Sequence, residues 1–387
     1  MVEIICDDQV LKKTLGKLVA LLQNQGAYFH PAMNICFDGK QFKITSSEVL
    51  KTIQKIAFIP ERCFVPFNSC AFSYTNGLIT IDSLEEGIRE VQAEIISLMV
   101  EVYNLADRFP EYMKSSVLSL FYEDKDFFEH LMEGLSFFDP EVLASCSREA
   151  GLLHHFLDNR TLSSNAAGTT EKVFVPVAEY FNNNLSAEHL YEEKGGKRFD
   201  ACSLPGTDEL FFHYGMIDAR HIFCYEGYIE KETNIVRSIG LDLELDALIN
   251  VRILSTWKRA DMSAVPENLR DLAYFLPDMQ IEKGKRITFA FLFIPPSQAP
   301  NALRRILYYA LQSAGINEQD LERFVYILEQ QIIQKNVKYY QSLLAYLSSA
   351  QFSHHITESL TEEIALMAES QLSKIKNYPF FRDIMAA

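Results

Sequence analysis

The chain has 387 residues, of which 48% are hydrophobic, so it can bury a full core and is expected to form two or three domains. Lysine and arginine number 36 against 52 acidic residues, and the formal charge is -16. That charge repels phosphate backbones and anionic lipid surfaces, which argues against nucleic acid as a partner and favours a basic peptide.

The cysteine pattern and the apolar stretches bear on the compartment. Seven cysteines are scattered with no CxxC pair and no zinc spacing, which indicates reduced thiols in a cytosol-like compartment. The N-terminus lacks a basic leader region, and the longest apolar stretch, 287–294, is too short to span a bilayer. We therefore expect a cytoplasmic protein without a membrane span, although leaderless export into a host cell would leave no mark here.

The first element is predicted to be a helix. Asp7 and Asp8 offer N-terminal caps, and apolar residues recur at helical spacing until Gly26 ends the pattern. Those apolar residues are Val10, Leu11, Leu15, Leu18, Val19 and Leu22. From 35 to 81 the pattern changes to short apolar runs separated by turn residues, which predicts a small β region.

A helical insert is predicted to split this β region. Residues 85–158 carry long apolar-periodic stretches with few β-branched residues. Strand-like patterns return at 173–178 and 210–214, and a turn at Pro205-Gly206 needs a positive φ at the glycine.

The remaining sequence is predicted to be largely helical. An extended segment at 235–243 leads into it, and one further strand is expected at 286–294. One helix follows Asn317 as its cap, and another runs from the capping-box pair Ser359 and Glu362 toward Lys376.

Three short segments carry the candidate chemistry. Val175–Asn183 reads VPVAEYFNN, Asp208–Gly215 reads DELFFHYG, and Tyr225–Ile229 reads YEGYI. Together they resemble the cofactor and active-site strands of SET-domain protein methyltransferases, in the branch that contains the Rubisco large-subunit lysine methyltransferase and the actin-histidine methyltransferase.

This resemblance implies an α+β protein with a split SET β-fold, a helical insert and a mostly α-helical C-terminal domain like those that bind substrate. The implied divisions are 1–84 for the N-terminal part of the SET domain, 85–158 for the insert, 159–232 for the C-terminal part and 233–387 for the substrate-binding-like domain. The implied activity is transfer of a methyl group from S-adenosyl-L-methionine to a lysine, or a histidine, of a protein that is basic at its target site.

Such a reaction asks the protein mainly to hold the methyl group and a neutral acceptor nitrogen at near-attack distance in a dry tunnel. Desolvation in the tunnel would help a lysine acceptor to lose its proton. The resemblance gives Tyr214 the role of orienting the acceptor, because a tyrosine hydroxyl there can contact both the amine and the polarised methyl group.

The resemblance also implies a set of cofactor-binding residues. Arg160 matches an arginine whose guanidinium fork suits the cofactor carboxylate. The other implied contacts come from the glycine-loop region, the acidic position, the asparagine segment and the Gly-aromatic pair. They are Gly39, Glu179, Asn182, Asn183 and Tyr228.

The sequence departs from the family pattern at three places. Asn183 replaces a histidine, Gln41 replaces the second glycine of the cofactor loop, and Asp218–His221 replaces the usual helix start. A working divergent enzyme and a catalytically inactive SET-like module for protein interaction both remain open. A helical scaffold unrelated to SET proteins is a third interpretation, and it fails if the first two motif segments are neighbouring strands.

Other chemistries have little support in the sequence. The pairs His154-His155 and His354-His355 invite a metal site, but adjacent residues on a helix diverge by about 100°, so we predict none. Neither a G-x-S-x-G elbow nor a P-loop is present, which leaves hydrolase and NTPase functions unsupported.

Overall fold

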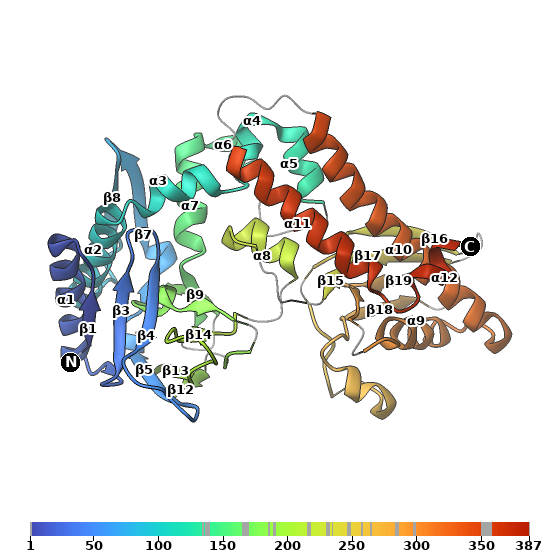
Figure 1. Ribbon diagram of the computed structural model, residues 1–387, viewed down its shortest axis with the longest axis horizontal. Helices are drawn as coiled ribbons and strands as arrows, with labels where there is room; N and C mark the ends of the chain where they lie inside the picture. The colour runs from blue at the N-terminus through green and yellow to red at the C-terminus, as the bar shows by residue number, and fades with distance from the viewer. Residues whose placement is uncertain are drawn as a thin grey trace. The chain divides into compact units, whose positions relative to one another are not determined.

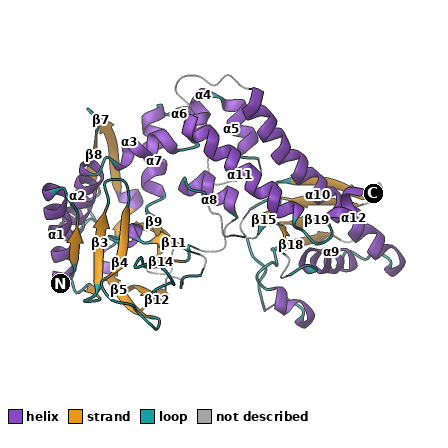
Figure 2. Cartoon of the chain, in the orientation of Figure 1, coloured by secondary structure: helices purple, strands orange, loops and turns teal. Residues whose placement is uncertain are grey.

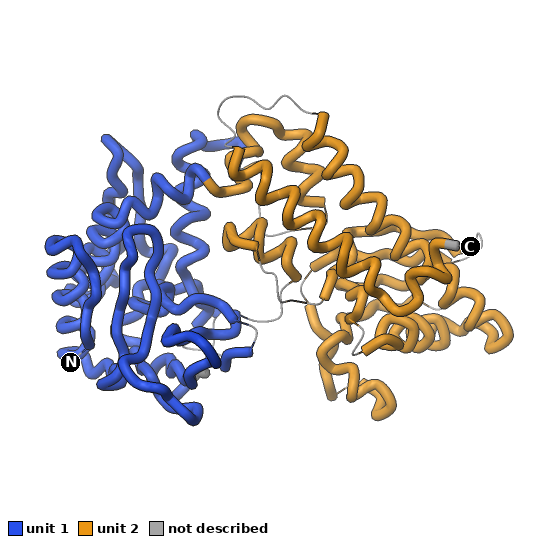
Figure 3. Tube along the Cα trace, viewed as in Figure 1, with its two compact units in different colours: residues 1–114, 142–217 blue, residues 115–141, 218–387 orange. Residues whose placement is uncertain are grey.

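The computed structural model describes the chain in two compact units (Figure 3). Unit 1 comprises residues 1–114 and 142–217, and unit 2 comprises residues 115–141 and 218–387. The described residues are 2–133, 135, 140–164, 170–184, 186–188, 191–214, 218–229, 233, 235–245, 249–256, 258–263, 265–282, 286–296, 299–349 and 358–386. Residues 115–141 of the predicted insert thus belong to unit 2, while the four-part division of the sequence remains a prediction.

Unit 1 contains the β region, with strands traced in Figure 1. They are β1 (Glu3–Ile5), β2 (Tyr28–Phe29), β3 (Met33–Phe37), β4 (Phe42–Ser46), β5 (Gln54–Pro60), β6 (Val65–Pro66), β7 (Cys70–Thr75), β8 (Leu78–Leu84), β9 (Thr161–Ser164), β10 (Glu171–Phe174), β11 (Asn182–Asn183), β12 (Tyr191–Glu193), β13 (Gly196–Ala201) and β14 (Phe211–Phe212). They form small sheets in the orders β1-β3-β4, β6-β10-β9, β12-β13-β5-β2, β11-β14 and β7-β8. Because β13 pairs with β5 and β10 with β6, strands from before and after the helical segment share sheets, as the split β region predicted.

The helices of this part of the chain agree with the predicted first helix and insert. They are α1 (Gln9–Asn24), α2 (Glu90–Leu105), α3 (Arg108–Ser115), α6 (Pro140–Ser145) and α7 (Arg148–Asp158). Asp8 caps α1 by accepting hydrogen bonds from the backbone N–H groups of Val10 and Leu11, at 2.8 and 2.9 Å. Burying one apolar stripe of α1 stabilises its docking, since each buried leucine contributes about 2 kcal/mol.

Unit 2 combines helices with a second β region (Figure 2). Its helices are α4 (Ser119–Glu123), α5 (Lys125–Leu131), α8 (Ala219–Glu226), α9 (Ala302–Ser313), α10 (Glu318–Ser349), α11 (Glu358–Lys376) and α12 (Phe381–Ala386), with a 3-10 helix at Glu267–Leu272. Its strands are β15 (Val236–Arg237), β16 (Leu241–Leu245), β17 (Ile249–Ile253), β18 (Met279–Glu282), β19 (Arg286–Phe289) and β20 (Phe293–Ile294). Strands in both units alongside many helices confirm the predicted α+β class.

Several local predictions need correction. The strand expected at 173–178 ends at Phe174, because Pro176 has no N–H to donate and Val177 has a left-handed backbone with φ of 72°. The helix expected to start at Ser359 already includes Glu358, so Ser359 is not its cap. The turn at Pro205-Gly206 is as predicted, with a φ of 81° at the glycine.

The largest correction concerns the region after the motifs. One strand was expected there at 286–294, whereas β16, β17, β19 and β18 form a four-stranded sheet and the predicted strand is divided into β19 and β20. The parallel pairing of β17 with β19 joins segments more than thirty residues apart. Local periodicity carries no information about such a pairing.

Two further findings concern disulfides and membrane-spanning helices. None of the seven cysteines forms a disulfide. Within the described residues, no helix is both long enough and apolar enough to cross a bilayer.

Candidate functional site

The first two motif segments are neighbouring strands. β11 runs parallel to β14, with Asn182 opposite Phe211 and Asn183 opposite Phe212. The N–H of Asn184 extends this pairing by donating to the Phe212 carbonyl at 2.9 Å. The condition under which the unrelated-scaffold interpretation fails is therefore met.

Tyr214 follows β14 and is tied to the opposite strand at two points. Its backbone N–H donates to Asn183 Oδ1 at 2.9 Å, and its hydroxyl donates to the Phe181 carbonyl. The side chain is 39% exposed, so its ring is within reach of a ligand. Asn183, which departs from the family's histidine, thus has a structural role as the acceptor that fixes the Tyr214 backbone. Gly215, the last residue of this motif, lies outside the described residues.

Asn182 is held by two acceptors. Its side-chain amide donates to Glu209 Oε1 at 2.6 Å and to the Phe42 carbonyl at 3.3 Å. These bonds orient the amide and connect β11 to β4. Glu209 also pairs with Thr45 of β4 in an isolated β-bridge. Burial raises the pKa of Glu209, opposed by its hydrogen bond from Asn182. Sequence reasoning did not select Glu209, although it is the glutamate of the DELFFHYG motif.

Gly39 lies at the tip of the hairpin that joins β3 to β4. Its φ of 90° suits glycine, and Asp38 Oδ1 accepts the N–H groups of Lys40 and Gln41, each at 3.0 Å. The bond from Gln41 and the nearby Lys43 ammonium lower the pKa of Asp38 to about 2. Gly39 and Gln41 are both exposed, and a Cβ built on Gly39 would meet no heavy atom within 4 Å. The predicted cofactor contact at Gly39 therefore stays a prediction.

Arg160 already contacts a carboxylate of the protein. Its Nε lies 3.2 Å from Glu179 Oε2, and its guanidinium carbon lies 3.5 Å from the centre of the Phe156 ring. Tyr103 donates from its hydroxyl to the same carboxylate at 2.7 Å. Burial raises the pKa of Glu179, and Arg160, Tyr103 and Arg108 oppose the rise. The predicted clamp and the predicted acidic position are thus partners of each other.

Tyr180 and Arg108 border this cluster, and sequence reasoning selected neither. The Tyr180 ring stacks on Phe42 at 4.4 Å between centroids, and the residue is 2% exposed. Its hydroxyl has no hydrogen-bond partner among the described residues, and Glu179, Arg108 and Arg160 act on it electrostatically. Tyr180 could have been noticed because it lies inside the VPVAEYFNN motif, whereas Arg108 comes from the helical insert with no signal of its own.

Tyr228 belongs to unit 2 and is described with it. It follows α8, which Gly227 ends with a φ of 80°, and its side chain is half-buried. The other six predicted residues lie in unit 1, where the structure brings Asn182, Asn183 and Tyr214 together, and Arg160 with Glu179. The cofactor contact predicted for Tyr228 stays a prediction.

No metal site emerges from the described residues, in which no cluster of three or more histidine, cysteine, aspartate or glutamate side chains could hold an ion. His154 is exposed and its ring lies 5.3 Å from Phe67, while His155 is buried and hydrogen bonded to Tyr112. The pair His354-His355 lies outside the described residues.

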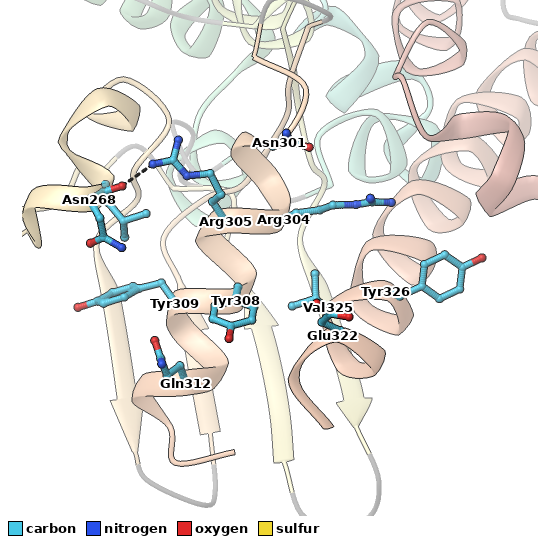
Figure 4. Close-up of a pocket in the computed structure, with 11 residues that line it drawn as sticks. Asn268, Asn301, Arg304, Arg305, Tyr308, Tyr309, Gln312, Glu322, Val325 and Tyr326 are labelled. Carbon is cyan, nitrogen blue, oxygen red and sulfur yellow. Dashed lines mark hydrogen bonds between the residues drawn. The ribbon is translucent and has the colours of Figure 1, made fainter. Parts of the chain in front are cut away.

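Within the part of the chain that the structure describes, two of the cavities have no predicted site residue in their lining. One, of about 620 Å³, lies in unit 2 along α9, beside α10 and the 3-10 helix, and Figure 4 shows Arg305 contacting Asn268 at its edge. Its lining comprises Asn268, Leu269, Asn301, Arg304, Arg305, Tyr308, Tyr309, Gln312, Glu322, Val325 and Tyr326. Both arginines already pair with carboxylates, Arg304 with Glu329 at 2.8 Å and Arg305 with Asp271 at 2.6 Å. The other cavity, of about 520 Å³, lies in unit 1 between β7 and α7.

No family model and no curated protein matches the chain. Solved structures of Rubisco LSMT, bound to AdoMet or to sinefungin and monomethyllysine, are each 11% identical over 96% of this chain and 92% of theirs, with TM-scores of 0.45 and 0.46. The SET domain of LSMT bound to lysine and AdoHcy is 11% identical over 97% of this chain and 90% of its own, with a TM-score of 0.42. Sequence identities and TM-scores this low describe a distant likeness of fold and support no conclusion about chemistry.

Proposed function

We propose that this protein is an S-adenosyl-L-methionine-dependent protein methyltransferase that acts on a lysine or a histidine side chain. The observation that carries the proposal is the parallel pairing of β11 with β14, which sets the Asn182-Asn183 pair directly beside the strand that leads to Tyr214. The acceptor would lie in a protein that is basic around its target, since the chain has a formal charge of -16. The absence of disulfides supports a cytoplasmic site of action.

The chain contains polar groups that fit such a cofactor. The Tyr180 hydroxyl is buried without a hydrogen-bond partner among the described residues, next to Arg108 and the Arg160–Glu179 pair. A buried polar group of this kind is costly unless a ligand or water completes its hydrogen bonding. In the proposal, Gly39, Arg160, Glu179, Asn182, Asn183 and Tyr228 bind the cofactor, which when bound would supply an electrophilic methyl group.

Tyr214 is proposed as the residue that orients the acceptor nitrogen. The Tyr214 hydroxyl donates a hydrogen bond to the Phe181 carbonyl, so its oxygen lone pairs point away from that carbonyl and can accept other contacts. Those lone pairs suit an N–H of the acceptor and weak CH···O contacts to a polarised methyl group. Asn183 supports this role because it fixes the Tyr214 backbone at 2.9 Å.

The first test is calorimetric titration of the full chain with S-adenosylmethionine and S-adenosylhomocysteine. Binding is expected in the unmodified chain and at least tenfold weaker in Asn182→Ala, because the amide that bridges Glu209 and Phe42 is lost. Asn24→Ala, an equal truncation at the exposed end of α1, should leave affinity unchanged. A folded chain that binds neither compound contradicts the proposal.

Catalysis is tested on peptide arrays that carry one central lysine or one central histidine in a basic context. Tyr214→Phe should retain cofactor affinity and lose methyl transfer, because only the hydroxyl contacts the acceptor. Transfer to lysine peptides alone, or to histidine peptides alone, identifies the acceptor. Equal transfer by Tyr214→Phe would remove Tyr214 from the reaction.

A second candidate function is a non-catalytic interaction module with the same fold. It is favoured by the Arg160–Glu179 contact, because a guanidinium already paired with a buried carboxylate is less available to a cofactor. The variants Gln41→Gly and Asn183→His distinguish the two. A decayed site should gain cofactor affinity from them, whereas a working site should gain little affinity and lose activity with Asn183→His, since Asn183 fixes Tyr214.

A further inference from the structure

A groove in unit 1 runs between strand β7 and helix α7, which lie side by side in the views of Figures 1 and 2 and contact each other. It has a volume of about 520 Å³. Five consecutive residues of β7 line one wall, together with Phe67 and Asn68, and one face of α7 lines the other. The helix and its N-cap residue contribute Ser147, Glu149, Ala150, Leu153, His154 and Leu157. The six-residue strand spans about 20 Å and the eleven-residue helix about 16 Å, so the groove is long enough for a short extended segment.

The β7–β8 hairpin leaves one strand edge toward this groove. Asn76 and Gly77 have φ values of 54° and 83°, as a type I′ turn requires, so Thr75 and Leu78 form the first hydrogen-bonded pair of the ladder. The alternation of an antiparallel ladder then directs the backbone groups of Phe72 and Tyr74 away from β8.

The partner strand confirms this alternation. Ile79, which faces Tyr74, directs its backbone away from β7, and both its N–H and its C=O are hydrogen bonded to the Asn104 side chain, at 2.8 and 2.9 Å. The outer edge of β8 is therefore occupied at Ile79. On the outer edge of β7, the N–H and C=O of Phe72 and Tyr74 make no hydrogen bond to any described residue outside the hairpin.

The side chains of this edge are fixed by packing. The Tyr74 ring meets Phe109 edge-on at 4.7 Å, and the Phe72 ring meets Phe174 edge-on at 6.1 Å. The edge thus presents a row of donors and acceptors flanked by packed aromatic rings, and an extended backbone is the partner that matches its spacing.

We propose that this groove binds an extended, basic segment of a partner protein, which adds to β7 as a strand. Among the described residues that line the groove, Glu149 is the one charged side chain apart from the titratable His154. The chain as a whole carries -16, so lysine or arginine in the segment complements the wall. Apolar side chains at alternate positions would contact the lining residues Phe67, Leu153 and Leu157. This inference is independent of the proposed methyl transfer, because none of its residues belongs to the candidate site.

The probe for this inference is the acetylated and amidated peptide Lys-Val-Lys-Val-Lys-Val, tested with the full chain by hydrogen exchange and fluorescence titration. The peptide should slow exchange of the Phe72 and Tyr74 amides and leave the Ile79 amide, already bonded to Asn104, unchanged. The peptide Glu-Val-Glu-Val-Glu-Val has the same strand propensity and opposite charge, and it should bind at least tenfold more weakly.

Two N-methylated forms of the basic peptide test strand addition itself. One is methylated at every lysine nitrogen of the backbone and the other at every valine nitrogen. A strand added at one edge uses the N–H groups of alternate residues, so one form should fail to bind and the other should bind. Equal binding of both forms, or failure of the unmodified peptide to bind, overturns the proposal.

Substitutions in the helix wall complete the test. Ala150→Tyr fills the groove from an exposed helical position and should weaken binding at least tenfold, while Ala144→Tyr, exposed on α6 outside the lining, should not. Glu149→Gln should weaken binding about two- to fivefold, as for a single exposed ion pair, and Glu94→Gln on the exposed face of α2 should not. Self-association of the chain that Ala150→Tyr abolishes would assign the groove to a second copy and overturn the proposal.

Discussion

Replacing Asp218 by asparagine is predicted to reduce the free energy of unfolding of unit 2 by about 3–5 kcal/mol. Asp218 Oδ2 lies 3.0 Å from Arg237 Nε, and the side chains are 1% and 2% exposed. At that distance the attraction of two unit charges is about 5–6 kcal/mol at an effective dielectric constant of about 20. Asparagine keeps the shape and the helix cap, because Asp218 Oδ1 accepts the His221 N–H at 3.1 Å and asparagine caps equally well.

The predicted loss is large because positive charge is left uncompensated. Arg220 is also fully buried, and burial lowers the pKa of His221 to about 4, so that ring is neutral at neutral pH. Without Asp218, Arg237 and Arg220 would remain buried, and among the described residues no other carboxylate acts on them. The loss is comparable with the whole stability of a small domain.

The assay is urea unfolding, with hydrogen exchange of the α8 amides as a report on unit 2 alone, because two compact units need not unfold together. The matched control is Asp242→Asn, whose partner Arg252 lies 3.4 Å away and whose side chain is 80% exposed. It should cost less than about 1 kcal/mol. The double variant Asp218→Asn with Arg237→Gln should be more stable than the sum of the single losses implies.

The pH dependence gives a second check. Burial alone raises the pKa of Asp218, but the charges of Arg237 and Arg220 and the hydrogen bond from the His221 N–H together hold the pKa below its ordinary value. The carboxylate therefore stabilises unit 2 above its unfolded pKa of 3.8, and this contribution is lost as the pH falls through the lower folded value. A loss below about 1 kcal/mol for Asp218→Asn, or strict additivity in the double variant, would refute the reasoning.

Three further outcomes are expected. Gly196→Ala should reduce the free energy of unfolding by about 1–3 kcal/mol in thermal unfolding, because its Cβ would lie 2.4 Å from the Ile59 carbonyl oxygen. Gly87→Ala, whose Cβ would meet nothing within 4 Å, should change stability by less than about 1 kcal/mol, and equal effects of the two changes would contradict the clash. Burial lowers the pKa of His155 to about 3 and of His221 to about 4, so both rings stay neutral in the folded chain while they gain a proton in the unfolded chain. Acidification from pH 6.5 to 4 should therefore reduce the free energy of unfolding by about 3 kcal/mol for each ring, and His221→Gln should reduce the slope of stability against pH in that window. Burial raises the pKa of Cys63 and Cys70 to about 11. Both thiols should therefore react with a disulfide reagent at pH 8 far more slowly in the native chain than in urea, and equal rates would show that the two thiols are accessible to the reagent in the native chain.

Elements specified by neighbouring residues were predicted well. The cap at Asp8, the start of α10 directly after Asn317 and the positive φ at Gly206 depend on contacts within a few residues, so their signals are local. Apolar and polar residues also alternate in Leu241–Leu245 and Ile249–Ile253, as is typical of strands. Only the first of these two strands was partly predicted, by the extended segment at 235–243. Their assembly into one sheet with β18 and β19 depends on pairings that periodicity does not contain.

The candidate site divides in the same way. The resemblance carried by the two motifs was enough to select Asn182, Asn183 and Tyr214 as candidates, and their strands are neighbours in the structure. The contact partners of the candidate residues could not be predicted from the sequence. The hydrogen bond from Asn182 to Phe42 and the contact between Arg160 and Glu179 join positions that the chain brings together only on folding. The sequence by itself determined the local elements and the polar groups available to them, since both follow from short-range geometry and side-chain chemistry. The tertiary structure alone decided that Asn183 fixes Tyr214, that Arg160 meets a carboxylate of its own chain, and that the β7 edge faces α7, because each depends on burial and on distances between segments far apart in sequence.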